Sequence, residues 1–234
     1  MADGKTPSTA PWLDEVKRTR LLTIHFDDSL GKTGWDQVFK SAITEFNKLS
    51  ANCKLGVTFA QEQGVDKANV EVQAPRGNFE FSYPPGAPKK TIPLDPAKPH
   101  GLCKPVMTVI KDQARIEQYR LMKAFIFVPA APSGDRNGKP SIVGDPVKLV
   151  IAVHEMIHAC GLVDDKEHSV DDVFSWPSLH MGNQPSEDRL ATLGGTITFP
   201  GKPNEPPRVG HSMVEMPPIF LKKDTADKVR NLWS

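Results

Sequence analysis

The sequence predicts an α+β fold, in which short strands and amphipathic helices follow one another along one domain. Segments with alternating apolar residues occur early in the chain, and a long amphipathic helix stands between the first two of them. A second, more apolar helix lies further along and precedes a proline-rich region. The chain has 234 residues, which is enough to bury a substantial core in one domain.

The first predicted strand covers residues 21–26, LLTIHF, and two aspartates follow it. A helix is predicted over 35–49, because apolar residues recur there with the spacing of one buried helical face. Thr33 and Asp36 have the spacing of a capping box at its start. The chain therefore begins with a strand and continues with a helix.

Further strands are predicted where apolar residues alternate with polar or small ones, over 55–60, 69–73, 106–110 and 123–128. Residues 74–105 include most of a proline-rich stretch, which we expect to be a surface loop because proline lacks the backbone donor. The stretch 113–121 has a helix-prone composition.

A second helix is predicted over 146–160. Asp145 is a favourable N-cap, and Pro146 suits the first helical position. Gly161 stands where a left-handed residue would end the helix, so a sharp turn is expected there.

The two ends of the chain are predicted to differ. Residues 1–19 lack the basic start and apolar core of a secretory signal and are expected to form a flexible tail. Proline and glycine are frequent over 177–218, and a last helix is predicted over 225–233, with Val229 and Leu232 packing inward.

Composition excludes several classes of partner. The chain has 29 basic and 28 acidic residues and a net charge of +1, so nucleic acid and anionic membranes are not expected partners. Its apolar runs are far shorter than the roughly 20 residues of a transmembrane helix. We expect a soluble protein, cytoplasmic by default or the mature part of an exported protein.

The segment VIAVHEMIHACGLVDDKEHS, residues 150–169, carries the main chemical signal. His154 and His158 are four residues apart on a predicted helix, so their rings lie on one face. Two such histidines can bind one zinc ion, and Glu155 can reach a water molecule at the metal without being a ligand. The sequence therefore predicts one catalytic Zn²⁺, with Glu155 as general base.

The motif His154-Glu155-x-x-His158-x-x-Gly161 resembles the start of the metzincin zinc-peptidase signature. The resemblance places the third ligand three residues beyond the glycine, at Asp164. His168 is the other candidate, and we favour it because imidazole is the commoner zinc ligand.

Metzincins also have a methionine turn beneath the metal. Met216, followed by two prolines and a terminal helix, resembles that turn more closely than Met213 or Met181 does. The resemblance implies a twisted, mostly parallel sheet of about five strands, a backing helix, an active-site helix and a C-terminal subdomain that ends in a helix.

The domain boundaries follow from the same resemblance. One zinc-peptidase domain is expected over 20–234, with an N-terminal subdomain over about 20–161 and a C-terminal subdomain over about 162–234. An insertion is expected near 175–212.

The implied activity is hydrolysis of peptide bonds, with a protein or peptide substrate that lies extended along a sheet edge. A propeptide or an inhibitor as a further partner is left open. So are two alternatives: a gluzincin-like zinc peptidase with Glu187 as third ligand, and a non-catalytic zinc-binding interaction module on the same fold.

Overall fold

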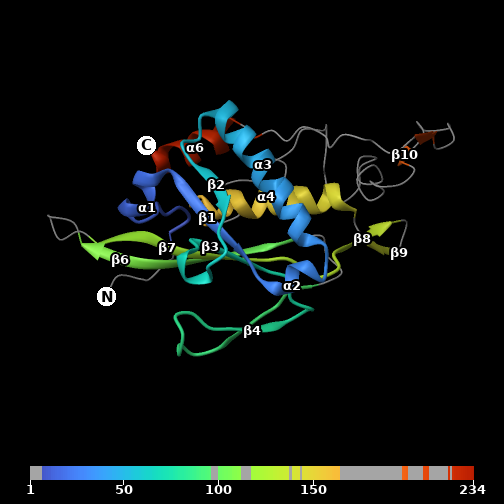
Figure 1. Ribbon diagram of the computed structural model, residues 1–234, viewed down its shortest axis with the longest axis horizontal. Helices are drawn as coiled ribbons and strands as arrows, with labels where there is room; N and C mark the ends of the chain where they lie inside the picture. Colours follow the sequence, from blue (N-terminus) through green and yellow to red (C-terminus); the bar gives the residue numbers. More distant parts are fainter. Residues whose placement is uncertain are drawn as a thin grey trace.

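The computed structural model describes most of the first two thirds of the chain and its C-terminal helix (Figure 1). The described residues are 7–95, 100–111, 117–136, 139–142, 144–163, 197–199, 208–210, 221 and 223–234.

The centre of the fold is a five-stranded sheet with the order β2-β1-β3-β7-β6. Its strands are β1 (Leu21–Phe26), β2 (Thr58–Gln61), β3 (Val70–Gln73), β6 (Leu102–Lys111) and β7 (Glu117–Phe127). The first four in the order run parallel, and β6 lies antiparallel to β7 at the edge. The predicted α+β class with a mostly parallel sheet is therefore confirmed.

The long helices α3 (Trp35–Cys53) and α4 (Asp145–Ala159) cover one face of this sheet (Figure 1). The other described helices are α1 (Asp14–Thr19), α2 (Asp28–Gly31) and α6 (Lys223–Trp233), with a short 3-10 turn η1 (Val65–Lys67). Helix α3 connects the parallel strands β1 and β2, because parallel neighbours need a crossover. It buries Trp35, Phe39 and Phe46 completely, as its apolar spacing predicts.

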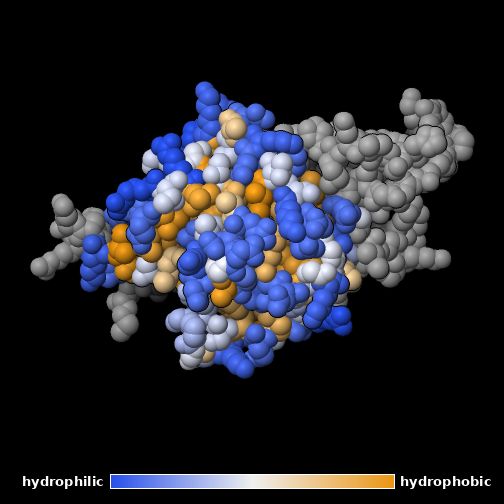
Figure 2. Space-filling model, viewed as in Figure 1, coloured by the Kyte–Doolittle hydropathy of each residue, from blue (hydrophilic) through white to orange (hydrophobic). Residues whose placement is uncertain are grey.

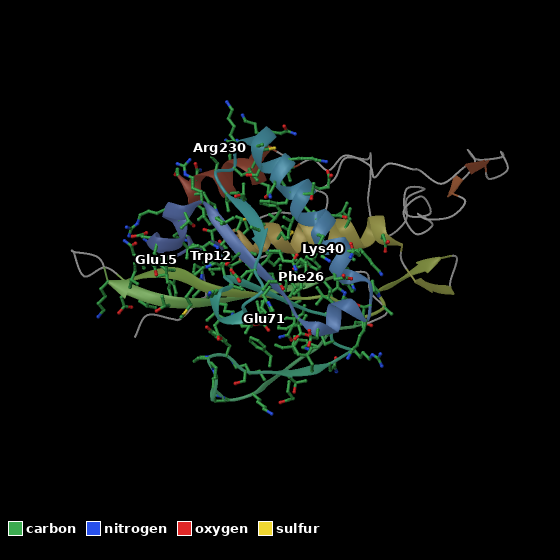
Figure 3. The ribbon with its side chains drawn as sticks, viewed as in Figure 1. Trp12, Glu15, Phe26, Lys40, Glu71 and Arg230 are labelled. Atoms are coloured by element: carbon green, nitrogen blue, oxygen red, sulfur yellow. The ribbon has the colours of Figure 1, made fainter. Side chains whose placement is uncertain are left out.

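The C-terminal helix α6 is fastened to the end of α3. Arg230, labelled in Figure 3, donates hydrogen bonds to the carbonyl oxygens of Cys53 at 2.6 Å and Lys54 at 3.3 Å. Val229 is fully buried, and Leu232 packs against the core from a partly buried position. The predicted inward face of this helix is confirmed.

The opposite face of the sheet carries an aromatic cluster below β7. Strands β4 (Phe79–Phe81) and β5 (Lys90–Ile92) form a hairpin there. The Phe79 ring lies 4.5 Å from that of Phe127, and the Phe81 ring 4.9 Å from that of Phe125. The prediction of a loop throughout 74–105 was wrong at this hairpin and at the start of β6, because aromatic packing and edge pairing hold both segments as strands.

The prediction of a helix-prone stretch over 113–121 was wrong at residues 117–121, which belong to β7. Leu121 is fully buried there and pairs with Met107, so pairing along β6 outweighs local helix propensity. Pro105 lies within β6, where an edge strand tolerates the missing donor.

Three smaller two-stranded pairs complete the described strands: β4–β5, β8 (Ser133–Arg136) with β9 (Lys139–Ile142), and β10 (Ile197–Phe199) with β11 (Arg208–Gly210).

The N-terminal segment differs from the expected tail over residues 7–19. Ala10 and Trp12 are buried, and residues 14–19 form α1. The amide of Leu13 donates to Leu121 O at 2.9 Å, and Leu121 N donates to Pro11 O at 2.8 Å. Apolar burial and strand-like pairing therefore hold a segment whose polar composition suggested a tail.

Two predicted helix caps were wrong by one position. The N-cap of α3 is Gly34 with φ 74°, and Thr33 donates to the Leu30 carbonyl instead of capping the helix. The N-cap of α4 is Gly144, so Asp145 is the first helical residue. In both cases the helix begins after a glycine, without a side-chain cap.

The described surface in Figure 2 is mainly hydrophilic, with hydrophobic residues between the polar ones. Within the described ranges, no helix is both long enough and apolar enough to cross a bilayer.

Candidate metal centre

Helix α4 is an apolar helix held inside the fold. It packs against α3 and against the strands β6 and β7. Its buried apolar residues include Val150, Ile151, Ala152, Val153, Met156 and Ile157. Polar side chains on such a helix need partners, because burying them alone is costly.

His154 and His158 lie one turn apart on α4 and face each other. Their Nε2 atoms are 3.2 Å apart, and the two rings, with centroids 4.9 Å apart, meet at 78°. Two ligands at 2.0–2.1 Å from one tetrahedral ion would have nitrogens about 3.3 Å apart. The observed separation therefore fits a shared zinc ion.

The orientation of His158 is fixed by the backbone that follows α4. Its Nδ1 lies 2.5 Å from the carbonyl oxygen of Leu162, and His158 is only 7% exposed. A carbonyl oxygen can only accept, so Nδ1 donates the proton. This hydrogen bond leaves the lone pair of the neutral ring on Nε2, the atom that points toward His154.

Two tryptophans satisfy the carbonyl groups at the C-terminal end of α4. The indole Nε1 of Trp12 donates to Ala159 O at 2.8 Å, and that of Trp233 donates to Cys160 O at 2.9 Å. The last carbonyls of a helix have no partner within the helix. The N-terminal segment and α6 therefore both hold the end of the histidine-bearing helix.

The turn after α4 has room only for glycine. Gly161 has φ 121°, and a Cβ atom added there would lie 2.5 Å from Ala10 O. Its carbonyl accepts from Ala10 N at 2.9 Å, and Val163 N donates to Ser8 O at 2.8 Å. The predicted sharp turn at Gly161 is confirmed, and the N-terminal segment fixes the path of the chain as far as Val163.

Glu155 lies on α4 between the two histidines in sequence and is only 3% exposed. It faces the beginning of β6, where a Cβ atom added to Gly101 would lie 2.5 Å from its Cγ. Cys103, two residues beyond Gly101, is close enough for the charge of Glu155 to affect its pKa. Burial raises the pKa of the Cys103 thiol well above its ordinary value, and the charges of Glu155 and Cys160 raise it further, against Lys104.

The three cysteines all lie in the described part of the chain, and each is a free thiol. Burial raises the pKa of the Cys160 thiol well above its ordinary value. Burial also raises the pKa of Cys53, against the opposing charge of Arg230. These thiols are therefore protonated packing groups.

The structure brings together three of the predicted site residues, His154, Glu155 and His158. The predicted third ligand, His168, and its alternative, Asp164, lie outside the described residues, as do Glu187, Met216, Met213 and Met181. Among the residues that are described, no group of three histidines, cysteines or carboxylates is placed to hold a metal ion. The third ligand therefore stays a prediction.

Sequence reasoning did not identify Gly101, Trp12 or Trp233 as neighbours of this centre. Their contacts join residues that are far apart in the sequence, and no local pattern marks them. The only available signal was the isolated glycine directly before a strand, which can mark close approach of another group.

No protein-family model matches the chain, and none of the curated proteins compared with it shows significant similarity.

Proposed function

We propose that the protein is a zinc-dependent endopeptidase of the metzincin type. The observation that carries the proposal is the 3.2 Å separation of the His154 and His158 Nε2 atoms, with the buried Glu155 next to His154 on the same helix. This spacing matches two ligands of one tetrahedral ion, and a glutamate between them supplies the base of the HExxH arrangement.

His154 and His158 would hold the zinc ion through Nε2, together with His168 or Asp164. A bound zinc ion would supply Lewis-acid activation of a water molecule and of the substrate carbonyl. The chain contributes the orientation of the ligands. The His158 ring is held by Leu162 O at 2.5 Å, which keeps its Nε2 lone pair directed at the site.

Glu155 acts as the general base. It accepts a proton from the attacking water as the new C–O bond forms at the scissile carbonyl carbon. It then donates that proton to the amine nitrogen as the C–N bond breaks, so that a carboxylic acid and an amine leave. Its burial excludes bulk water from the carboxylate and holds it in one place.

The edge of the sheet offers a binding position for the substrate backbone. Strand β6 is the last strand in the order, with β7 as its neighbour among the described strands. Gly101, the residue directly before this strand, lies against Glu155, so an extended peptide added along this edge would run past the base. Backbone pairing of this kind is compatible with many side chains, which suits an endopeptidase.

The variant Glu155→Gln tests this function, because glutamine keeps the size of the side chain but cannot accept the proton. We expect wild-type zinc content by elemental analysis and a loss of casein hydrolysis of about 10²- to 10⁴-fold. Full activity in Glu155→Gln, or a zinc-loaded wild type that hydrolyses neither casein nor other unfolded proteins, would refute the proposal. The second result would favour the zinc-binding interaction module instead.

A further inference from the structure

Gly101, the residue directly before β6, lies against the side chain of Glu155. A Cβ atom added to Gly101 would lie 2.5 Å from Cγ, 2.8 Å from Cδ and 2.7 Å from Oε1 of Glu155. Real Cβ atoms essentially never approach other heavy atoms below 3.0 Å. Glu155 in its present position therefore leaves no room for a side chain at residue 101.

The register of β6 explains why Gly101 and Cys103 face α4. Cys103 pairs with Ile126, which belongs to the core beneath the helices. Directly opposed residues point to the same face, and so do residues two apart along a strand. Gly101 and Cys103 are therefore expected on the α4 side, in agreement with the contact to Glu155 and with the effect of Glu155 on the Cys103 thiol.

Backbone freedom does not account for the glycine at this position. The glycines with positive φ include Gly161, whereas Gly101 is not among them. Other residues could adopt the Gly101 backbone, so the requirement for glycine comes from space. Glu155 is 3% exposed, and a methyl group at residue 101 would have to displace either its side chain or the edge strand.

We propose that Gly101 is a positioning residue for Glu155. Its missing side chain lets the start of β6 close over the carboxylate and hold it in one direction. This inference rests on the proposed function, in which Glu155 carries the proton. A displacement of the carboxylate should lower the rate of the chemical step while the two histidines still hold zinc, because a small misplacement of a catalytic group is costly.

The first test compares Gly101→Ala with the matched control Gly31→Ala. Gly31 has no positive φ, and a Cβ atom there would meet nothing within 4 Å. We expect Gly101→Ala to keep wild-type zinc content and a KM within about 2-fold, with kcat on a fluorogenic peptide reduced roughly 10²-fold. Gly31→Ala should match the wild type in all three. An unchanged kcat in Gly101→Ala would overturn the proposal, as would equal effects in both variants.

The second test needs no activity. The urea midpoint of zinc-free protein is measured for the wild type, Gly101→Ala, Glu155→Ala and the double variant. We expect Gly101→Ala to lower the midpoint by roughly 0.3–1 M when Glu155 is present and to have little effect when residue 155 is alanine, because the clash is then removed. If Gly101→Ala does not fold alone, recovery of folding in the double variant gives the same support.

The two tests separate the possible failures. An equal loss of midpoint with and without Glu155 would show that Gly101 does not act on this side chain, and the proposal would fail. An inactive zinc-loaded wild type combined with the expected midpoint coupling would refute the catalytic role of both residues while retaining the contact between them.

Discussion

The indole Nε1 of Trp12 donates a hydrogen bond to the carbonyl oxygen of Ala159 at 2.8 Å. This bond joins the N-terminal segment to the last turn of the helix that carries both histidines, across 147 positions of sequence. Trp12, labelled in Figure 3, is 1% exposed, so the bond is shielded from water. With Trp233 on Cys160 O, it makes the end of α4 dependent on both ends of the described chain.

Trp12→Phe should therefore weaken both folding and zinc binding. Phenylalanine leaves the buried Ala159 carbonyl without its donor, which should lower the free energy of unfolding by about 1–3 kcal/mol. Loss of support at the exit of α4 should also reduce zinc affinity about 10-fold. Urea unfolding of the zinc-free protein measures the first effect, and competition with a chromophoric chelator measures the second.

Trp35→Phe is the matched control for this prediction. Trp35 also donates from a buried indole, to Pro129 O at 2.8 Å, but this contact lies at the start of α3. Trp35→Phe should show a similar loss of stability with unchanged zinc affinity. Equal losses of zinc affinity in Trp12→Phe and Trp35→Phe would contradict a specific role for the exit of α4.

Gly161→Ala should be more destabilising than its backbone conformation alone would require. A positive φ costs a non-glycine residue about 1–3 kcal/mol, and the contact with Ala10 O should add a similar amount. Gly77 has φ 82° with nothing within 4 Å of an added Cβ, so Gly77→Ala measures the cost of a positive φ in the absence of a clash. Chemical denaturation of the two variants compares them, and equal destabilisation would show that Ala10 does not confine the turn.

The raised pKa values of two thiols, the partly buried Cys103 and the buried Cys160, predict a loss of stability in alkaline solution. Burial raises the pKa values of Cys103 and Cys160 well above their ordinary value in the folded protein. The unfolded chain therefore loses thiol protons first, above its ordinary pKa of about 8.5. The contribution to stability is complete below that pH and declines as pH rises toward the folded-state pKa values.

Cys103→Ala should flatten this alkaline decline relative to the wild type. Free energies of unfolding measured by urea between about pH 7.5 and 10 give the two slopes, and the slopes are compared because the substitution also changes packing. Parallel slopes would mean that the thiol does not titrate differently in the folded and unfolded states.

The helices were the most predictable part of the fold. Helical spacing identified α3 and α6, because each buries one stripe of apolar residues, whereas α4, buried at five consecutive positions over 149–153, was identified by Pro146 near its start and Gly161 after its end. The pairing of His154 with His158 followed from the same geometry, since residues four apart share a helical face. Sequence alone therefore identified the central part of the candidate site.

Long-range contacts were not predictable from local patterns. Residues 117–121 have helix-prone neighbours, yet pairing with β6 makes them a strand. Trp12 belongs to a polar, proline-containing segment, and its burial depends on a helix end far along the sequence. The contact of Gly101 with Glu155 likewise requires the register of the edge strand, which no single segment encodes.

The third zinc ligand can be assigned by comparing His168→Ala with Asp164→Ala. We expect His168→Ala to lose zinc during dialysis and Asp164→Ala to retain it, because imidazole is the commoner ligand. Loss of zinc in Asp164→Ala alone would assign the aspartate. Retention in both, with loss in Glu187→Ala, would favour the gluzincin-like arrangement.

The most direct measurement of the central claim is the zinc content of the purified wild type, after dialysis, beside His154→Ala and His158→Ala. His25→Ala serves as the control, because His25 lies on β1 with its Nδ1 3.2 Å from Glu62 O. We predict about one zinc ion per chain in the wild type and in His25→Ala, and little or none in the other two variants. A wild type that retains no metal, or equal zinc content in all four proteins, would contradict a zinc site at His154 and His158.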